Sequence, residues 1–143
     1  MTENRNRITV GLFMIASHIA VFIALVAFTF AGGFSFEELT TTAGIIGPLF
    51  AGYTSAIIAF IIKHKDDRSY GQNKINPVYA LVSCAIPALF VAAVLCLIAL
   101  RAYNVGIADF DTFKTLIGVT ESAFGIYVGQ FIYSMFEAKS ASA

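Results

Sequence analysis

One carboxylate, Glu121, lies in the middle of a long apolar stretch late in the chain, and His18 lies at a comparable depth in the first apolar stretch. A carboxylate inside a membrane costs roughly 2.5 to 3.5 kcal/mol on insertion scales, so it usually faces the protein interior, a partner group or water. The two residues therefore predict a buried carboxyl and imidazole pair that binds an ion or a proton. The alternative is a neutral Glu121 that only bonds a hydroxyl or carbonyl group in a tightly packed bundle.

Tyr53 lies in the second half of the second apolar stretch, and Tyr127 lies in the second half of the fourth, which also contains Glu121. Each hydroxyl needs a hydrogen-bond partner when its ring is buried. We expect both residues to anchor the interior through hydrogen bonds. A direct part in the polar site with Glu121 and His18 is the second interpretation.

The sequence lacks the short motifs of common catalytic and metal sites. It contains no CxxC, HExxH, P-loop or GxSxG pattern, and His18 and His64 lie on separate segments with no second ligand at helical spacing. Cys84 and Cys96 share one apolar stretch, and a helix would hold them about 18 Å apart, too far for a disulfide. We expect no metal, no cofactor and no enzymatic activity.

Small residues form two faces at helical spacing. Each face has four residues separated by four, three and four positions: Gly44, Pro48, Ala51 and Ser55 in the second apolar stretch, and Gly118, Ser122, Gly125 and Gly129 in the fourth. The last two form a GxxxG pair, which lets helix backbones approach closely. One interpretation is that the faces pack two helices of one chain together, and the other is that one of them faces a neighbouring chain or a pore.

Four apolar stretches position these residues, at 8–30, 39–62, 77–100 and about 115–136. Hydrophobic residues make up 58% of the chain and charged residues 13%, against roughly 25% charged in soluble domains. Each stretch is long enough for a transmembrane helix, and lipid offers backbone groups no partner outside a helix. The sequence predicts an all-α integral membrane protein in which residues 1–143 form a single domain of four transmembrane helices, arranged as two tandem hairpins.

The basic residues predict the orientation of the helices. Only Arg101 and Lys114 lie on one side of the predicted membrane, and seven lie on the other: Arg5, Arg7, Lys63, Lys65, Arg68, Lys74 and Lys139. By the positive-inside rule, both termini and the loop 63–74 are cytoplasmic. We therefore expect a multi-pass protein of a bacterial inner membrane. The net charge of zero argues against direct binding of nucleic acid.

An offset of 74 residues aligns the chain with itself. Seven identities fall between positions 32 and 58, and they pair Gly32 with Gly106, Phe36 with Phe110, Thr41 with Thr115, Gly44 with Gly118, Phe50 with Phe124, Tyr53 with Tyr127 and Ile58 with Ile132. This predicts an internal duplication with halves 1–62 and 75–136, related as parallel repeats about a pseudo-twofold axis along the membrane normal. The alternative is independent use of small residues in packed helices.

Three functions fit these features. The first is a homo-oligomeric assembly that forms or gates a permeation path, because four thin helices leave little room for a pore in one chain. The second is a membrane anchor or sensor that recruits a soluble cytoplasmic partner, as in a bacterial stress or antiphage defence system, through Lys63, Lys65, Arg68 and Lys74. A proton-coupled small transporter that uses Glu121 is the third.

Overall fold

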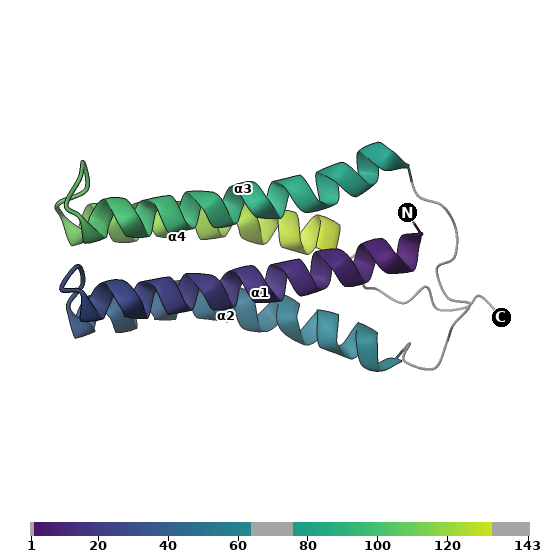
Figure 1. The fold of residues 1–143 in the computed structure, drawn as a ribbon, viewed down its shortest axis with the longest axis horizontal. Coiled ribbons are helices and arrows are strands. Elements are labelled where there is room, and N and C mark those ends of the chain that lie inside the picture. The colour runs from purple at the N-terminus through teal and green to yellow at the C-terminus, as the bar shows by residue number, and fades with distance from the viewer. Residues whose placement is uncertain (1, 64–75, 133–143) are drawn as a thin grey trace.

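The chain is all-helical in the residues that the computed structural model describes, 2–63 and 76–132, with side chains described to Gln130. Figure 1 shows four long helices: α1 (Glu3–Phe30), α2 (Phe36–Lys63), α3 (Pro77–Ala102) and α4 (Phe110–Tyr127). A π-helical turn, η1 (Val128–Ile132), continues α4. The predicted all-α class is confirmed, and within these residues there is no strand.

The helix starts are fixed by side-chain caps. Thr2 caps α1 and Asn76 caps α3, each by accepting a hydrogen bond from a backbone N–H of the first turn. Asp109 caps α4 by accepting from the Thr112 N–H at 2.8 Å, and this bond holds the pKa of Asp109 below its ordinary value. Because of that cap, α4 begins five residues before the predicted apolar stretch.

The two described turns end their preceding helices in the same way. After α1, the Gly32 N–H donates to the Thr29 carbonyl at 3.0 Å, and after α3 the Asn104 N–H donates to the Arg101 carbonyl at 3.0 Å. Gly32 and Asn104 both have positive φ, 85° and 54°, which is the left-handed conformation of this helix ending. Each turn then returns the chain antiparallel, giving the hairpins α1–α2 and α3–α4.

The hairpins lie side by side as a square bundle. Helix α1 packs on α2 and α3, and α4 packs on α2 and α3, so α1 and α3 are neighbours that run in the same direction (Figure 1). A twofold axis along the bundle would instead place two helices of the same direction at opposite corners. The duplication therefore stays a prediction, and the packing relates the hairpins by a sideways shift rather than by the predicted twofold axis.

Three of the helices, α1, α2 and α3, are long and apolar enough to cross a membrane. The described part of α4 contains Asp111, Lys114 and Glu121 and is not among them. The last four residues of the predicted fourth span, 133–136, lie outside the described residues. The chain thus has the helices of a small membrane protein.

Two apolar clusters fill the bundle. One, near the start of α1, includes Val10, Met14, Tyr53, Ile57 and Phe124, and the other, toward the described turns, includes Val21, Leu25, Ile46, Val94 and Ile117. His18 lies between Met14 and Val21 on α1, and Glu121 lies between Ile117 and Phe124 on α4. Both predicted polar residues therefore occupy the level where the two clusters meet.

Candidate functional site

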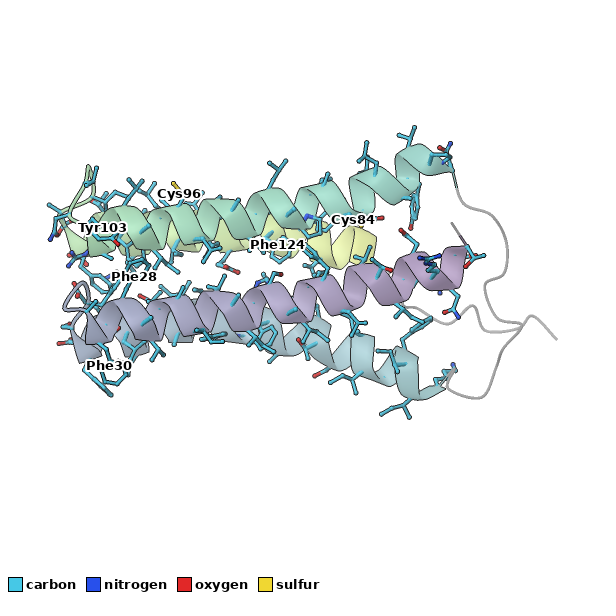
Figure 2. The ribbon with its side chains drawn as sticks, in the orientation of Figure 1. Phe28, Phe30, Cys84, Cys96, Tyr103 and Phe124 are labelled. Atoms are coloured by element: carbon cyan, nitrogen blue, oxygen red, sulfur yellow. The ribbon has the colours of Figure 1, made fainter. Side chains whose placement is uncertain are left out.

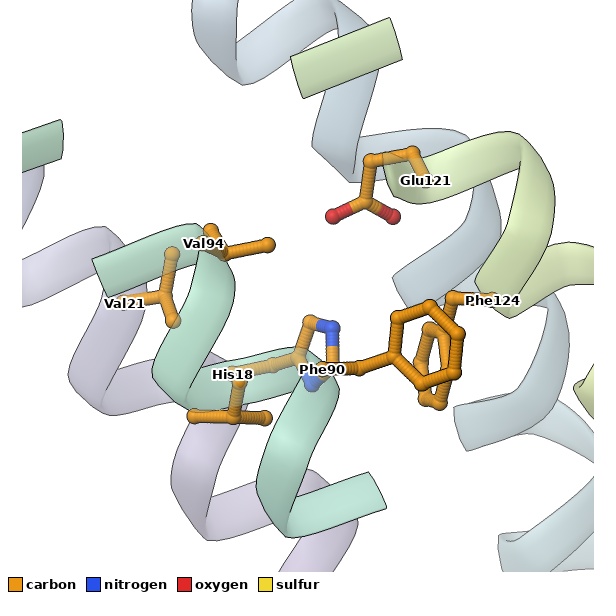
Figure 3. Close-up of a pocket in the computed structure, with 7 residues that line it drawn as sticks. His18, Val21, Phe90, Val94, Glu121 and Phe124 are labelled. Atoms are coloured by element: carbon orange, nitrogen blue, oxygen red, sulfur yellow. The ribbon is translucent and has the colours of Figure 1, made fainter. Parts of the chain in front are cut away.

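Glu121 and His18 line one small pocket in the middle of the bundle. Their side chains come from α4 and α1, the diagonal helices of the square, and they point toward one another (Figure 3). Glu121 is 6% exposed and His18 is 3% exposed. The rest of the lining is apolar, from Val21, Phe90, Val91, Val94 and Phe124. As packed, the pocket is too small to admit a water molecule.

Aromatic rings hold the imidazole of His18 in place. The ring stacks on Phe50 of α2 and on Phe124 of α4, with centroid separations of 5.5 and 5.7 Å. Tyr53 of α2 meets it edge-on at 5.1 Å. Three rings packed at these separations leave the imidazole little freedom to rotate, so its two nitrogens have fixed surroundings.

The hydrogen bonds of this site are incomplete. His18 Nδ1 lies 3.2 Å from the Met14 carbonyl oxygen. Among the described residues, the buried oxygen Oε2 of Glu121 has no hydrogen-bond partner, and neither has the buried hydroxyl of Tyr53. The great majority of buried polar atoms in proteins have a hydrogen-bond partner, so a buried atom without one needs a chemical explanation. We name His18, Tyr53 and Glu121 the polar layer.

Tyr127 does not belong to this layer. Its ring stacks on Phe124, and its hydroxyl donates to the Ser83 carbonyl at 3.3 Å, toward the start of α3. Asn6 reaches the same region, where its amide donates to the Ser83 hydroxyl at 3.1 Å. Of the four residues that the sequence pointed to, the structure brings three together, and it uses Tyr127 as an interior anchor.

The residues that sequence reasoning missed are the apolar ones around the layer. Phe50 and Phe124 both stack on His18, although the sequence indicates them only as one pair of the possible repeat. Figure 2 shows Phe124 directed into the bundle, whereas Cys96 is directed away from it. Phe90, Val91 and Val94 seal the pocket from α3. Their burial in α3 follows from helical periodicity, but that pattern does not say which polar residues they cover.

A second polar contact was also missed, at the end of the bundle near the described turns. Arg101, at the end of α3, pairs with Glu38 in the first turn of α2 at 2.5 Å, and both side chains are mostly buried. The same carboxylate accepts from the Ser35 N–H, while the Glu38 N–H donates to the Ser35 hydroxyl, which is the capping box of α2. Arg101 also lies 5.8 Å from the ring of Phe34. One pair thus joins the two hairpins at this end.

The small-residue face is the second candidate site, and on α2 it points away from the bundle. The α2 residues Gly44, Pro48, Ala51 and Ser55 are all exposed. Ser122 of α4 and Gly129 of η1 are exposed, and Gly118 and Gly125 of α4 are half-buried. A Cβ at Gly44, Gly118 or Gly129 would have no atom within 4 Å, and one at Gly125 would lie 3.8 Å from Leu49. The face does not mainly pack α2 against α4.

Large apolar side chains are missing from the exposed surface of α2 at the level of this face. Between Phe36 and Ile58, no large hydrophobic residue of α2 is exposed, whereas α1 exposes Leu12, Ile19 and Ile23 over the corresponding depth. The hydroxyls of Ser55 and Ser122 donate to the carbonyl four residues earlier, at 2.8 and 2.7 Å. These donations satisfy the hydroxyl hydrogens and leave the oxygens free to accept.

The chain matches no protein family, no curated protein and no solved structure. Function must therefore be inferred from the polar layer and the small-residue face. Of the predicted partner loop, only Lys63 is described, and it is exposed at the end of α2. Lys65, Arg68 and Lys74 lie outside the described residues.

Proposed function

We propose that this chain is a four-span protein of a bacterial inner membrane, with both termini in the cytoplasm, that assembles with copies of itself into a channel-like permeation or gating element. The observation that carries this proposal is the exposed small-residue face of α2, which has no partner in the described part of the chain. Helices in lipid associate through such faces, because close backbone approach brings van der Waals contacts that large side chains would prevent.

The position of the permeation path follows from the packing of one chain. Two apolar clusters fill the interior of the described bundle, so a path for water or ions has to run between chains rather than through one. The small-residue face is the surface best suited to line it. Its glycines leave space, and the oxygens of Ser55 and Ser122 can accept hydrogen bonds from water or coordinate a cation.

Substitution of Ala51 by Leu tests the assembly. Ala51→Leu adds bulk to the exposed small-residue face, and Ala20→Leu makes the same change at an exposed position of α1, beside Ile19 and Ile23. Native mass spectrometry from lipid nanodiscs should show an oligomer for the wild type and for Ala20→Leu, and a shift to smaller species for Ala51→Leu. Ion flux into liposomes that contain the purified protein should fall with the oligomer.

Two results would contradict the proposal. The first is a wild-type chain that stays monomeric in nanodiscs at high protein-to-lipid ratio, because the proposed oligomer would then not form. Equal flux and equal oligomer distributions for Ala51→Leu and Ala20→Leu would mean that the small-residue face contacts only lipid. Recruitment of a soluble partner by the loop 63–74 would then be the function to pursue.

A further inference from the structure

We propose that the main-chain carbonyl of Gly44 is a ligand for an alkali-metal cation in the permeation path between chains. Two prolines lie inside apolar helices, Pro48 in α2 and Pro87 in α3. A helical carbonyl accepts a hydrogen bond from the N–H four residues later, and proline has none, so the carbonyls of Gly44 and Ser83 lack their usual donor. The inference rests on the proposed channel and names the class of ion that it conducts.

The chain supplies a replacement donor for the buried one of these two carbonyls. Ser83 and Pro87 are both buried, and the Tyr127 hydroxyl of α4 donates to the Ser83 carbonyl at 3.3 Å. Within a membrane, a carbonyl freed by proline needs such a donor from a neighbouring helix, a hydroxyl or water, because lipid offers none. Helix α3 thus shows how this fold compensates for a proline that faces its interior.

The described residues supply no such donor to the Gly44 carbonyl, which lies on the exposed face of α2. Gly44 and Pro48 are both exposed, and a Cβ on Gly44 would have no atom within 4 Å. The serine hydroxyls of the small-residue face donate to other carbonyls, those of Ala51 and Gly118. At the position of α4 aligned with Pro48, Ser122 has both the N–H and the hydroxyl that proline lacks. The partner of the Gly44 carbonyl therefore has to come from outside the described bundle.

The charges and oxygens of this face favour a monovalent cation as that partner. Glu37 is exposed and lies seven residues before Gly44, which is two turns or about 10 Å along the same side of the helix. Between Glu37 and Ser55, α2 contains no Lys, Arg or His. An exposed carboxylate at the end of the face attracts cations and repels anions. The oxygens at the level of Gly44 are neutral, which suits Na⁺ or K⁺ better than Ca²⁺ or Mg²⁺, because divalent cations bind through carboxylates.

One carbonyl is not a complete ion site, and the assembly supplies the other ligands. Copies related by rotation about the path would each present Gly44 at the same level, which gives a ring of carbonyl oxygens. Such rings replace the water around a cation in selectivity filters. Gly44 has no side chain to separate the helices or to cover its carbonyl, so the ring forms only if residue 48 leaves that carbonyl free.

Pro48→Ala tests the ligand, because it restores the N–H that the Gly44 carbonyl lacks. Pro87→Ala is the matched control, since it makes the same change at a carbonyl to which Tyr127 already donates. K⁺ flux into liposomes that contain the purified protein should exceed Cl⁻ flux, fall several-fold for Pro48→Ala and stay unchanged for Pro87→Ala. Lactic acid at position 48 differs from alanine by an ester oxygen in place of the N–H. It should retain the wild-type flux.

Native mass spectrometry of the same variants separates this inference from the proposed function. A wild type without an oligomer or without flux would refute the channel, and the ion site with it. An oligomeric wild type that conducts no better than Pro48→Ala, that prefers Cl⁻, or that loses as much flux with lactic acid as with alanine would refute the ion site alone. If Pro48→Ala dissociated the oligomer, the carbonyl would accept a hydrogen bond from the neighbouring chain, which also overturns its assignment to an ion.

Discussion

Substituting Phe for Tyr53 should stabilise the fold. The Tyr53 side chain is fully buried, and its hydroxyl has no hydrogen-bond partner among the described residues. Burying such a hydroxyl costs roughly 1 to 3 kcal/mol. Phenylalanine keeps the ring contacts with His18 and Phe124 and removes the unpaired group. We expect the free energy of unfolding to rise by about 1 kcal/mol, because the hydroxyl finds partners in the unfolded chain but has none in the folded one.

Tyr127→Phe is the matched control, at the position aligned with Tyr53 by the offset of 74. The Tyr127 hydroxyl donates to the Ser83 carbonyl over 3.3 Å, a long bond. Interhelical hydrogen bonds in membrane proteins average about 0.6 kcal/mol, so this change should lower the free energy of unfolding by about that amount. The same substitution at aligned positions should therefore have opposite signs.

Reversible unfolding in mixed micelles, followed by circular dichroism, measures both changes on the same scale. The sign of the Tyr53→Phe effect decides the matter. A loss of stability similar to that of Tyr127→Phe would show that the Tyr53 hydroxyl is paired in the folded protein, with Glu121 as the candidate partner, and the reasoning from an unpaired hydroxyl would be wrong.

Three further predictions concern the turns and the bundle end that they form. Gly33→Ala should lower the free energy of unfolding by about 1 to 3 kcal/mol, because the new Cβ would lie 2.8 Å from the Cβ of Ala102 and 3.0 Å from its backbone atoms. Gly44→Ala is the control and should leave stability unchanged, because its Cβ would have no atom within 4 Å. Thermal unfolding in detergent compares the two variants. Arg101→Met should lower the free energy by about 1.5 to 3 kcal/mol, the usual value of a charged hydrogen bond, and a Glu38→Gln background should reduce this loss in a double-mutant cycle. Asp109 has a folded-state pKa below its unfolded value, so its cap stabilises the fold above the unfolded pKa, and this stability is lost as the pH falls through the folded pKa. Asp109→Ala should therefore reduce the fall in melting temperature at acid pH and leave the rest of the pH profile unchanged.

The helices and the depth of the polar layer could be predicted from the sequence, because both depend on residue type and spacing along one chain. Uninterrupted apolar stretches fix α1, α2 and α3, and counting from the helix ends places His18 and Glu121 at one level. The start of α4 was placed too late, because hydropathy does not register a cap such as Asp109. The direction of the small-residue face could not be predicted. Helical spacing shows that Gly44 and Ser55 share a face, but only the packed bundle shows what covers it.

The fate of the aligned residues follows from how the two hairpins pack. In the structure, the buried residues of α2 are matched by those of α4 and η1 at an offset of 71 rather than 74: Thr42, Ile46, Tyr53 and Ile57 against Phe113, Ile117, Phe124 and Val128. The two offsets differ by three residues, which turn a helix by about 300°, or 60° short of a full turn. The inward faces of α2 and α4 are therefore rotated by about 60° relative to the aligned residues. A twofold axis along the bundle would make this difference zero.

A sideways shift of one hairpin explains the rotation. In a square bundle, neighbouring corners present inward faces about a right angle apart, so aligned residues of α2 and α4 cannot all have the same environment. Phe50 of α2 and Phe124 of α4 both stack on His18. Tyr53 and Tyr127 lie one turn further along, where one hydroxyl enters the core and the other reaches α3. A duplicated hairpin that packs beside its copy would thus keep identical residues but give them different neighbours. For this reason α4 can bury a carboxylate, Glu121, although the aligned helix α2 buries none at that level.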